Sequence, residues 1–287
     1  MGLIYVSRGL GGVAVLDMYK LLLVDLDGVV WRGSRLLQEN IEWLRRARSS
    51  SISVVFVSNN STRSRRVYAE RLTRIIGFEV EIEDVVTSGY AVARWLRETS
   101  GPSRVLVVGE EGLVEELLQQ GHWVLSIGDG ARCPVDYVVV GLDRNLTYAR
   151  LRAAHLAIRH CGARLVAAND DASVPVENGD EPGAGAILAA LERSTGVKAA
   201  FIAGKPNPYM YELVLKRRGV EPRQALVIGD RCDTDIAAAE KLGIDSVLVL
   251  TGVAGEQGDR CKATYVVDTL ADLDRTEVPG FSTHSVS

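Results

Sequence analysis

Short apolar runs alternate along most of the chain with stretches in which apolar residues recur every three or four positions. The predicted strands span residues 20–25, 52–58, 105–109, 136–141, 164–168, 199–204, 225–230 and 246–251. Each run is apolar at consecutive positions, which is typical of strands that are covered by helices on both faces. Leu37, Ile41 and Leu44 illustrate the helical spacing between the runs. This alternation predicts an α/β fold with mainly parallel sheets.

Polar residues gather where four of these strands end. The four groups begin at Asp25, Ser58, Lys205 and Asp230, and parallel sheets bind their ligands beyond the carboxyl ends of the strands. Residues 81–178 separate the second group from the third and contain strands and helices of their own. A stretch of this length is enough for an inserted domain.

The predicted organisation is, in chain order, an N-terminal arm (1–17), the first part of a main domain (18–80), an inserted α/β domain (81–178), the second part of the main domain (179–275) and a C-terminal tail (276–287). For the first 17 residues two interpretations stay open. They form an additional arm, or they precede a true start at Met18.

The amino-acid composition limits the classes of partner that the protein is expected to bind. The 287 residues carry a net charge of −4 and only 6% are aromatic, which argues against nucleic acid and anionic membrane surfaces as partners. No run of 18 apolar residues is present to span a bilayer. The apolar N-terminal stretch is interrupted by Arg8 and Asp17 and lacks the cleavage site of a signal peptide. We predict a cytoplasmic protein.

The four cysteines, Cys133, Cys161, Cys232 and Cys261, are widely spaced and form no CxxC pair, and the four histidines are scattered. This spacing argues against a zinc site and against a disulfide framework. We predict free buried thiols, as expected in a reducing cytosol.

The first polar group contains two carboxylates, Asp25 and Asp27, that directly follow an apolar strand. Carboxylates leaving a buried strand are costly unless a cation or another partner compensates them. Gly28 then allows a tight turn. A simple strand-end turn, in which Asp and Gly are common, explains the same residues.

The other three groups are equally ambiguous one by one. The segment from Ser58 to Thr62 suits either an anion site or a helix N-cap. Lys205 suits either a phosphoryl group or an exposed loop. Asp230 and Asp235 lie in a segment with three acidic residues in six positions, which is typical of a site for a hard cation or of helix capping.

Taken together and in this order, the four groups resemble the signature motifs of the haloacid dehalogenase (HAD) phosphohydrolase superfamily. The resemblance is closest to its class IIA branch, the NagD-like, p-nitrophenylphosphatase-like family. The segments that carry it are DLDGVVWRG (25–33), VSNNSTRS (57–64), VVVGLDRNLTY (138–148), PGAGAI (182–187), AGKPNPYMYE (203–212), VIGDRCDTDIAAAEKLG (227–243) and LVLTGV (248–253). The resemblance covers about residues 18 to 270 and implies a Rossmann-like parallel-sheet core with a large inserted α/β cap domain.

The resemblance also implies roles for individual residues. Asp25 would be the nucleophile that becomes an aspartyl-phosphate. Asp27 would be the general acid that protonates the leaving alcohol and then the base that activates water. Ser58 and Lys205 would bind the transferring phosphoryl group, and Asn59 would add a contact to it.

The implied cofactor is Mg²⁺. Asp25, Asp27 through its main-chain carbonyl, and Asp230 would hold the ion. Asp235 matches the second acidic position of the fourth motif, which would hold either Lys205 or the water shell of the metal.

In the class IIA branch, a loop of the cap with the pattern Asn-x-Asp reaches toward the leaving group. Asn169 and Asp171 match this pattern, although Asp170 replaces the usual proline. Members specialised for pyridoxal phosphate carry His-Pro where this chain has Val174-Pro175, which disfavours that substrate.

The leading hypothesis is a Mg²⁺-dependent phosphatase that acts on a small phosphorylated metabolite. It would cleave p-nitrophenyl phosphate in vitro and a phosphate ester of the sugar, glycerol or nucleotide class in vivo. Two alternatives stay open: a phosphotransferase or mutase, in which another alcohol replaces water, and a non-catalytic sensor of a phosphorylated ligand. A dinucleotide-binding oxidoreductase is disfavoured because no GxGxxG follows the first strand. The resemblance further implies a homodimer formed through the cap.

Overall fold

The computed structural model describes residues 18–128, 132–176, 179–252 and 262–275. The predicted arm (1–17), the predicted tail (276–287) and Cys261 lie outside the described residues. The chain divides into two compact units. Of the described residues, the first unit contains 18–57, 72–79, 211–252 and 262–275, and the second contains 58–71, 80–128, 132–176 and 179–210.

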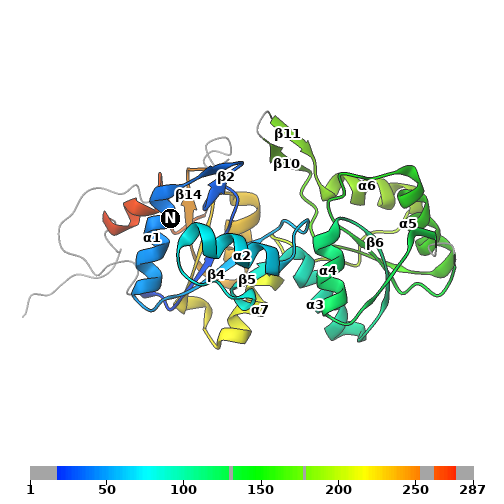
Figure 1. Ribbon diagram of the computed structural model, residues 1–287, viewed down its shortest axis with the longest axis horizontal. Coiled ribbons are helices and arrows are strands. Elements are labelled where there is room, and N and C mark those ends of the chain that lie inside the picture. The colour runs from blue at the N-terminus through cyan, green and yellow to red at the C-terminus, as the bar shows by residue number, and fades with distance from the viewer. Residues whose placement is uncertain (1–17, 129–131, 177–178, 253–261, 276–287) are drawn as a thin grey trace, which may run out of the picture. The chain divides into compact units, whose positions relative to one another are not determined.

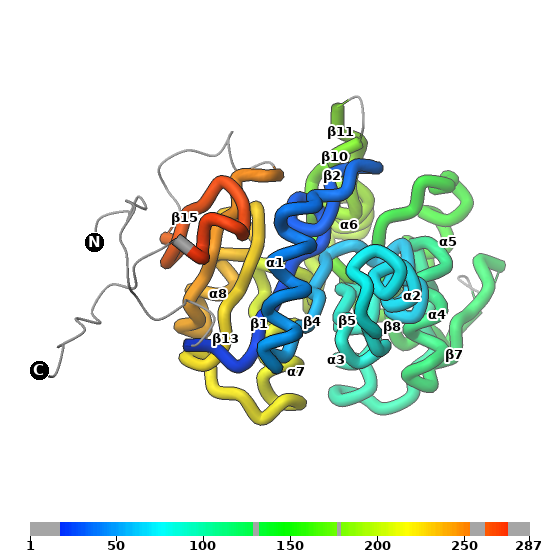
Figure 2. Tube along the Cα trace, turned by 60° about the vertical axis from the view of Figure 1, so that its left-hand side comes forward, coloured from blue at the N-terminus to red at the C-terminus, as the bar shows by residue number. Residues whose placement is uncertain are grey.

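The first unit is built on a parallel sheet. Its strands are β1 (Leu21–Val24), β4 (Ser53–Ser58), β13 (Ala225–Gly229), β14 (Asp245–Val249) and β15 (Tyr265–Val267). They lie in the order β15-β14-β13-β1-β4, and Figure 2 shows β13 beside β1. The register aligns Val24 of β1 with Ile228 of β13 and with Phe56 of β4. The residues that follow β1 and β13 therefore emerge at the same edge of the sheet.

The elements outside this sheet are shorter or helical. They are β2 (Trp31–Arg32), β3 (Arg35–Leu36), α1 (Gln38–Ser49) and α8 (Ala237–Leu242). The helices α2 (Arg65–Ile76) and α7 (Tyr209–Arg218) each begin in the second unit and end in the first. In α1 the buried residues include Ile41, Trp43 and Leu44, so the helical spacing of the sequence does mark a face that packs against the core.

The second unit contains its own parallel sheet. The strands β12 (Phe201–Ile202), β9 (Arg164–Ala167), β8 (Tyr137–Val140), β6 (Arg104–Val108) and β7 (Trp123–Leu125) lie in that order. The remaining elements are β5 (Val85–Thr87), α3 (Ser88–Ser100), α4 (Glu111–Gln119), α5 (Tyr148–Cys161), β10 (Ser173–Val176), β11 (Gly179–Pro182) and α6 (Ala184–Thr195). Figure 1 shows α3 and α4 on one side of β6 and α5 and α6 on the other.

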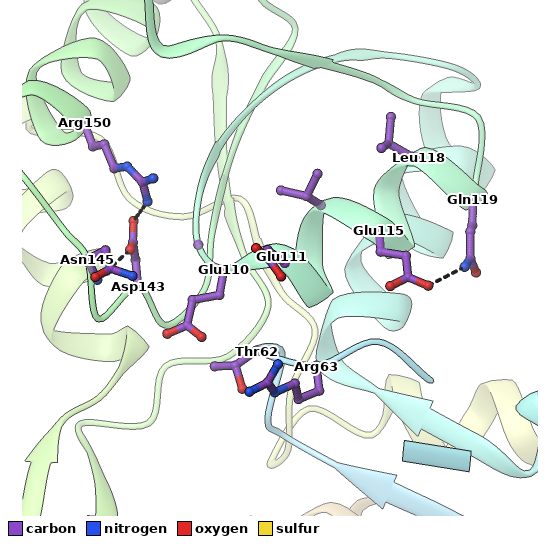
Figure 3. Close-up of a pocket in the computed structure, with 12 residues that line it drawn as sticks. Thr62, Arg63, Glu110, Glu111, Glu115, Leu118, Gln119, Asp143, Asn145 and Arg150 are labelled. Carbon is purple, nitrogen blue, oxygen red and sulfur yellow. Dashed lines mark hydrogen bonds and ion pairs between the residues drawn. The ribbon is translucent and has the colours of Figure 1, made fainter. Parts of the chain in front are cut away.

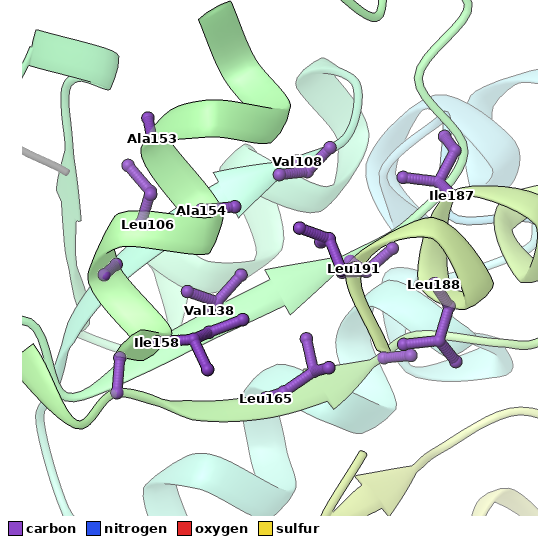
Figure 4. Packing of buried hydrophobic residues seen from close by; sticks show 14 of the residues in the cluster. Leu106, Val108, Val138, Ala153, Ala154, Ile158, Leu165, Ile187, Leu188 and Leu191 are labelled. Carbon is purple, nitrogen blue, oxygen red and sulfur yellow. The ribbon is translucent and has the colours of Figure 1, made fainter. Parts of the chain in front are cut away.

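One layer of the core of the second unit lies between this sheet and the helices α5 and α6. Leu106, Val138 and Leu165 from three strands meet Ile158 of α5 and Leu191 of α6 (Figure 4). All five side chains are at most 5% exposed. Burial of a side chain of this size contributes about 1.5–3 kcal/mol, so this layer fixes α6 to the sheet of the second unit.

The extent of the second unit differs from the predicted inserted domain. The prediction ended that domain at residue 178, whereas in the structure the second unit continues to Met210. Two contacts account for the difference: β12 pairs in parallel with β9, and α6 buries Leu188 and Leu191 against the layer just described. An apolar run predicts a strand but does not tell which of two sheets the strand joins.

The predicted α/β class with parallel sheets is confirmed. All eight predicted strands are present, with ends shifted by a few residues. The hairpins β2–β3 and β10–β11 and the short strands β5, β7 and β15 were missed. The hairpin strands have exposed or partly exposed side chains and lack the apolar run that marks a buried strand. The strands β5, β7 and β15 are apolar, but each has only three residues, too few to indicate a strand by pattern. Within the described part of the chain, no helix is both long and apolar enough to cross a membrane.

The prediction of free thiols is wrong for the described cysteines. Cys133 and Cys161 form a disulfide across 28 residues of sequence, and Cys232 is also disulfide-bonded. Cys133 precedes β8, and Cys161 is the last residue of α5. Wide spacing in the sequence concealed the pair, because the fold brings the two Cα atoms to 5.3 Å.

Replacing both cysteines of this pair with serine (Cys133→Ser with Cys161→Ser) is expected to lower the free energy of unfolding by about 2–4 kcal/mol, because the unfolded chain gains the entropy of an open loop. Denaturant unfolding without reductant, followed by circular dichroism, measures the change. With reductant, the wild type should lose its advantage over the variant. An advantage that persists under reducing conditions would attribute the loss to packing and contradict the prediction.

Candidate active site

Three buried aspartates form an acidic cluster in the first unit. Asp25 directly follows β1, Asp230 directly follows β13, and Asp235 lies in the helical turn Cys232–Ile236. Each provides a carboxylate oxygen, and these oxygens lie within 4.8 Å of one another. Asp25 is 9%, Asp230 4% and Asp235 1% exposed. The parallel pairing of β1 with β13 brings these carboxylates together from segments about 200 residues apart.

Glycines leave the space that the cluster needs. A Cβ atom at Gly28 would lie 2.3 Å from Oδ2 of Asp230, and one at Gly252 would lie 1.9 Å from the same oxygen. Gly28 also has a φ of +87°, a conformation that glycine adopts without steric cost. At Gly229, a Cβ atom would lie 2.3 Å from Cβ of Asp235. Any side chain at these positions would displace a carboxylate of the cluster.

Two polar residues that the sequence analysis did not single out hold the turn after β1. The Thr251 hydroxyl donates to the carbonyl of Gly28 at 2.6 Å. The side-chain amide of Asn40, which is 1% exposed, donates to the carbonyl of Val29 at 2.9 Å and accepts from the N–H of Leu270 at 2.8 Å. Asn40 stands among the apolar positions of α1, and a buried polar residue there is the signal that could have revealed it.

Asp27 occupies a different environment from the three clustered aspartates. Its side chain is exposed, and its carboxylate accepts a hydrogen bond from Nε1 of Trp31 at 2.9 Å. Among the described residues the acidic cluster does not include Asp27. Of the four predicted metal-binding residues, the structure therefore brings three carboxylates together. This arrangement is compatible with a ligand role for the Asp27 carbonyl and leaves its carboxylate accessible for proton transfer.

The cluster fits a divalent metal ion. Two carboxylates about 4.8 Å apart repel each other by roughly 3–4 kcal/mol at an effective dielectric constant of about 20. Burial strengthens this repulsion and also removes solvation from each charge. A small hard cation that takes only oxygen ligands offsets both costs. The donor set is therefore that of a Mg²⁺ or Ca²⁺ site.

A second polar group lies in the second unit. Ser58, the last residue of β4, is 2% exposed, and its hydroxyl oxygen accepts from the N–H of Asn60 at 3.1 Å. Lys205 follows β12 and is also 2% exposed. Burial of a lysine requires compensation of its charge, as expected for a residue that binds an anion.

Asn59 joins this group through its side chain. Its Oδ1 accepts from the N–H of Lys205 at 2.8 Å, and its Nδ2 donates to the carbonyl of Lys205 at 3.0 Å. The same Nδ2 donates to Oδ2 of Asp171 at 3.1 Å. Asn169, 4% exposed, donates from Nδ2 to the carbonyl of Asn59 at 2.7 Å. The structure thus brings Asn59, Asn169 and Lys205 together, while their predicted contacts to a substrate stay predictions.

A buried ion pair anchors the chain just beyond this group. Glu116 of α4 accepts from the N–H of Arg65 at 2.6 Å and from its Nε at 3.1 Å. The side chains are 0% and 9% exposed, respectively. The guanidinium also lies 3.7 Å from the centre of the Tyr90 ring, within the range of a cation–π contact. These contacts fix the start of α2 against α4.

Removing one residue of the Arg65–Glu116 ion pair should destabilise the folded protein. Replacing Glu116 with alanine is expected to lower the free energy of unfolding by about 3–5 kcal/mol, because it leaves the Arg65 charge buried without its partner. Glu115→Ala provides a matched control, since the neighbouring Glu115 pairs with Arg66 in exposed positions, and such pairs contribute about 1 kcal/mol or less. Denaturant unfolding compares the two variants, and equal losses would contradict this assignment.

A broad pocket of about 680 Å³ lies elsewhere in the second unit (Figure 3). It opens beside Gly109 and Asp143, which follow β6 and β8. Two of its carboxylates have arginine partners: Asp143 pairs with Arg150 and Glu110 with Arg144. The hydrogen bonds from Arg144 lower the pKa of Glu110. None of the predicted site residues lines this pocket, and the acidic cluster remains the candidate catalytic site.

The fold and the acidic cluster together indicate the class of protein. A parallel sheet with aspartates at the ends of two adjacent strands, interrupted by an α/β unit, is the architecture of the HAD-like hydrolases. Comparison with family models agrees: residues 22–122 match the haloacid dehalogenase-like hydrolases, and residues 202–273 match a second HAD-hydrolase-like model.

The similarity to individual relatives extends over nearly the whole chain. The 5'-nucleotidase YutF of Bacillus subtilis is 34% identical over 88% of this chain and 97% of its own. The structure of the p-nitrophenyl phosphatase of Archaeoglobus fulgidus has a TM-score of 0.81 at 33% identity, covering 89% of this chain and 98% of that one. The magnesium complex of a glycerol phosphate phosphatase from Mycobacterium tuberculosis has a TM-score of 0.80 at 34% identity, covering 93% and 79%.

The chain therefore belongs to the haloacid dehalogenase-like hydrolases, in their NagD-like class IIA branch. With this family it belongs to the enzymes that hydrolyse phosphoric monoesters.

Proposed function

We propose that the protein is a Mg²⁺-dependent phosphatase that cleaves a small phosphomonoester through an aspartyl-phosphate on Asp25. The observation that carries the proposal is the buried cluster in which Asp25, Asp230 and Asp235 present oxygens within 4.8 Å of one another. A cation beside the Asp25 carboxylate would reduce the repulsion between this anionic nucleophile and an anionic phosphate ester. The magnesium complex of the glycerol phosphate phosphatase supports the choice of metal.

Asp25 and Asp230 would hold the ion with the carbonyl of Asp27, and Asp235 would lie in its outer shell. When bound, the metal would reduce the repulsion between the Asp25 carboxylate and the phosphoryl oxygens. Ser58 and Lys205 would bind the phosphoryl group and offset the charge that develops on it.

Two steps complete the reaction. In the first, an oxygen of Asp25 attacks phosphorus, the bond to the leaving oxygen breaks, and Asp27 donates its proton to that oxygen. In the second, Asp27 takes a proton from water, and the water oxygen attacks the phosphorus of the aspartyl-phosphate. This step releases inorganic phosphate and restores the carboxylate of Asp25. The exposed position of Asp27 and its hydrogen bond to Trp31 suit a group that exchanges protons with solvent.

The proposed substrates are phosphate monoesters of small hydroxylated molecules. The printed names of the relatives, a 5'-nucleotidase, a p-nitrophenyl phosphatase and a glycerol phosphate phosphatase, support this range.

The cytoplasmic location stays a prediction. The proposed substrates favour it, because phosphorylated metabolites are made inside cells. The Cys133–Cys161 disulfide is typical of oxidising compartments, although intracellular proteins of hyperthermophiles also contain disulfides.

Asp25→Asn tests the reaction. We expect this variant to lose at least about 1,000-fold in kcat toward p-nitrophenyl phosphate, because a carboxamide is a poor nucleophile. EDTA should abolish wild-type turnover, and added Mg²⁺ should restore it. Asp233→Asn serves as a control, since this neighbouring carboxylate is exposed and pairs with Arg231. It should retain activity within about twofold, as expected for a surface pair. An Asp25→Asn variant that remains folded and fully active would refute the mechanism.

We further propose that the protein is a homodimer joined through the second unit. The strand β7 is the last in its sheet, and large apolar side chains are exposed on it and beside it. Trp123 on β7 is 59% exposed, Leu118 at the end of α4 is 54% and Ile127 is 40%. An apolar edge strand of this kind is suited to pair with a second copy.

Trp123→Glu is expected to convert the dimer into a monomer, because a charge replaces the largest apolar side chain of this edge. Light scattering coupled to size-exclusion chromatography measures the mass. Tyr148→Glu, a change at a residue that is 82% exposed on α5, should leave the dimer intact. A monomeric wild type, or a dimeric Trp123→Glu variant, would exclude this interface.

A further inference from the structure

We infer that Asn59 is a positioning residue that couples Asp171, in the loop after β9, to the main chain of Lys205. The inference rests on the proposed function and assigns Asn59 a role other than the substrate contact that the family resemblance implies. Its basis is the set of hydrogen bonds that the Asn59 side chain makes within the second unit.

Lys205 determines the orientation of the Asn59 amide. The N–H of Lys205 donates to Oδ1 at 2.8 Å, and the carbonyl of Lys205 accepts from Nδ2 at 3.0 Å. The reverse orientation would bring two donors and two acceptors face to face, so this reciprocal pair identifies which atom is oxygen and which is nitrogen. The pair holds the main chain at the base of the Lys205 side chain.

The remaining donor of the amide is also in use. Nδ2 carries two protons, of which one goes to the carbonyl of Lys205 and the other to Oδ2 of Asp171 at 3.1 Å. The Asn59 side chain therefore has no proton left to donate to a phosphoryl oxygen. The same amide bridges a loop carboxylate and the main chain of a residue proposed to bind the phosphoryl group.

Asn169 connects the same two residues, Asn59 and Asp171, through their main chain. Its Nδ2 donates to the carbonyl of Asn59 at 2.7 Å, and its Oδ1 accepts from the N–H of Asp171 at 3.2 Å. Gly204 packs against both asparagines: a Cβ atom there would lie 2.7 Å from Cβ of Asn169 and 2.9 Å from Oδ1 of Asn59. Asn169 therefore also holds main chain, through the carbonyl of Asn59 and the N–H of Asp171.

The arrangement makes the loop and the lysine move together. A displacement of Asp171 acts on Asn59, and through the two amide bonds it acts on the main chain of Lys205. Misplacement of a catalytic group by about 1 Å costs about 100-fold in rate. Asn59 thus converts the position of the loop into the position of the Lys205 charge, and its loss should lower kcat more than it raises KM.

A charge-swap experiment tests this coupling with p-nitrophenyl phosphate as the probe. Asn59→Asp keeps the shape of the side chain but places a carboxylate against Asp171, and we expect about a 10- to 100-fold loss in kcat. Asp171→Asn alone should cost less. The double variant, Asn59→Asp with Asp171→Asn, restores a donor and an acceptor between positions 59 and 171 but not the bond from residue 59 to the carbonyl of Lys205. It should therefore recover part of the loss, about threefold over Asn59→Asp. Rescue of this kind does not follow from a substrate contact or from a general loss of stability.

Each outcome is informative. If the double variant is no more active than Asn59→Asp, or if the loss appears only in KM, the positioning role is wrong. If Asn59→Asp fails to fold, Asn59→Ala and Asp171→Ala form the cycle, and effects that multiply independently would also overturn the inference. A wild type that lacks phosphatase activity altogether would refute the proposed function. An active wild type without rescue would refute only the coupling.

Discussion

Mutual repulsion among three buried carboxylates is the constraint on which the first unit depends. Asp25, Asp230 and Asp235 approach one another within 4.8 Å while being at most 9% exposed, so each carboxylate raises the free energy of the other two when all three are charged. The parallel register of β1 and β13 enforces this approach. The glycines around Asp230 and the bonds from Thr251 and Asn40 to the turn after β1 hold it there. These contacts keep the three carboxylates in the arrangement that the proposed cation site requires.

In the second unit, neutral amide side chains hold a buried charged residue in place. A buried lysine must be held where its charge is useful, and Lys205 is held through its main chain by Asn59. Amides suit this task because one side chain both donates and accepts and carries no charge to desolvate. The anchor formed by Arg65, Glu116 and Tyr90 fixes the segment that follows. In this unit, neutral amides thus hold the main chain of Lys205, whose charged side chain is proposed to bind the phosphoryl group.

Much of the candidate site could be predicted because its chemistry is local. Asp25, Ser58, Lys205 and Asp230 each follow a consecutive apolar run, and parallel strands covered on both faces leave no other place for polar residues than their ends. The roles of Asn59 and Asn169 could not be read in this way. Their partners are main-chain atoms 110 and 146 residues distant in sequence, and no local pattern records such contacts.

By itself, the sequence determined the α/β class, the eight principal strands and the set of polar residues at their ends, because hydrophobic periodicity follows directly from burial. The tertiary structure alone decided which sheet a strand joins, as β12 shows by pairing with β9. It also decided that Cys133 and Cys161 are bonded and that Asp27 stands apart from the acidic cluster. These features depend on distances between segments remote in sequence, and such distances exist only once the chain has folded.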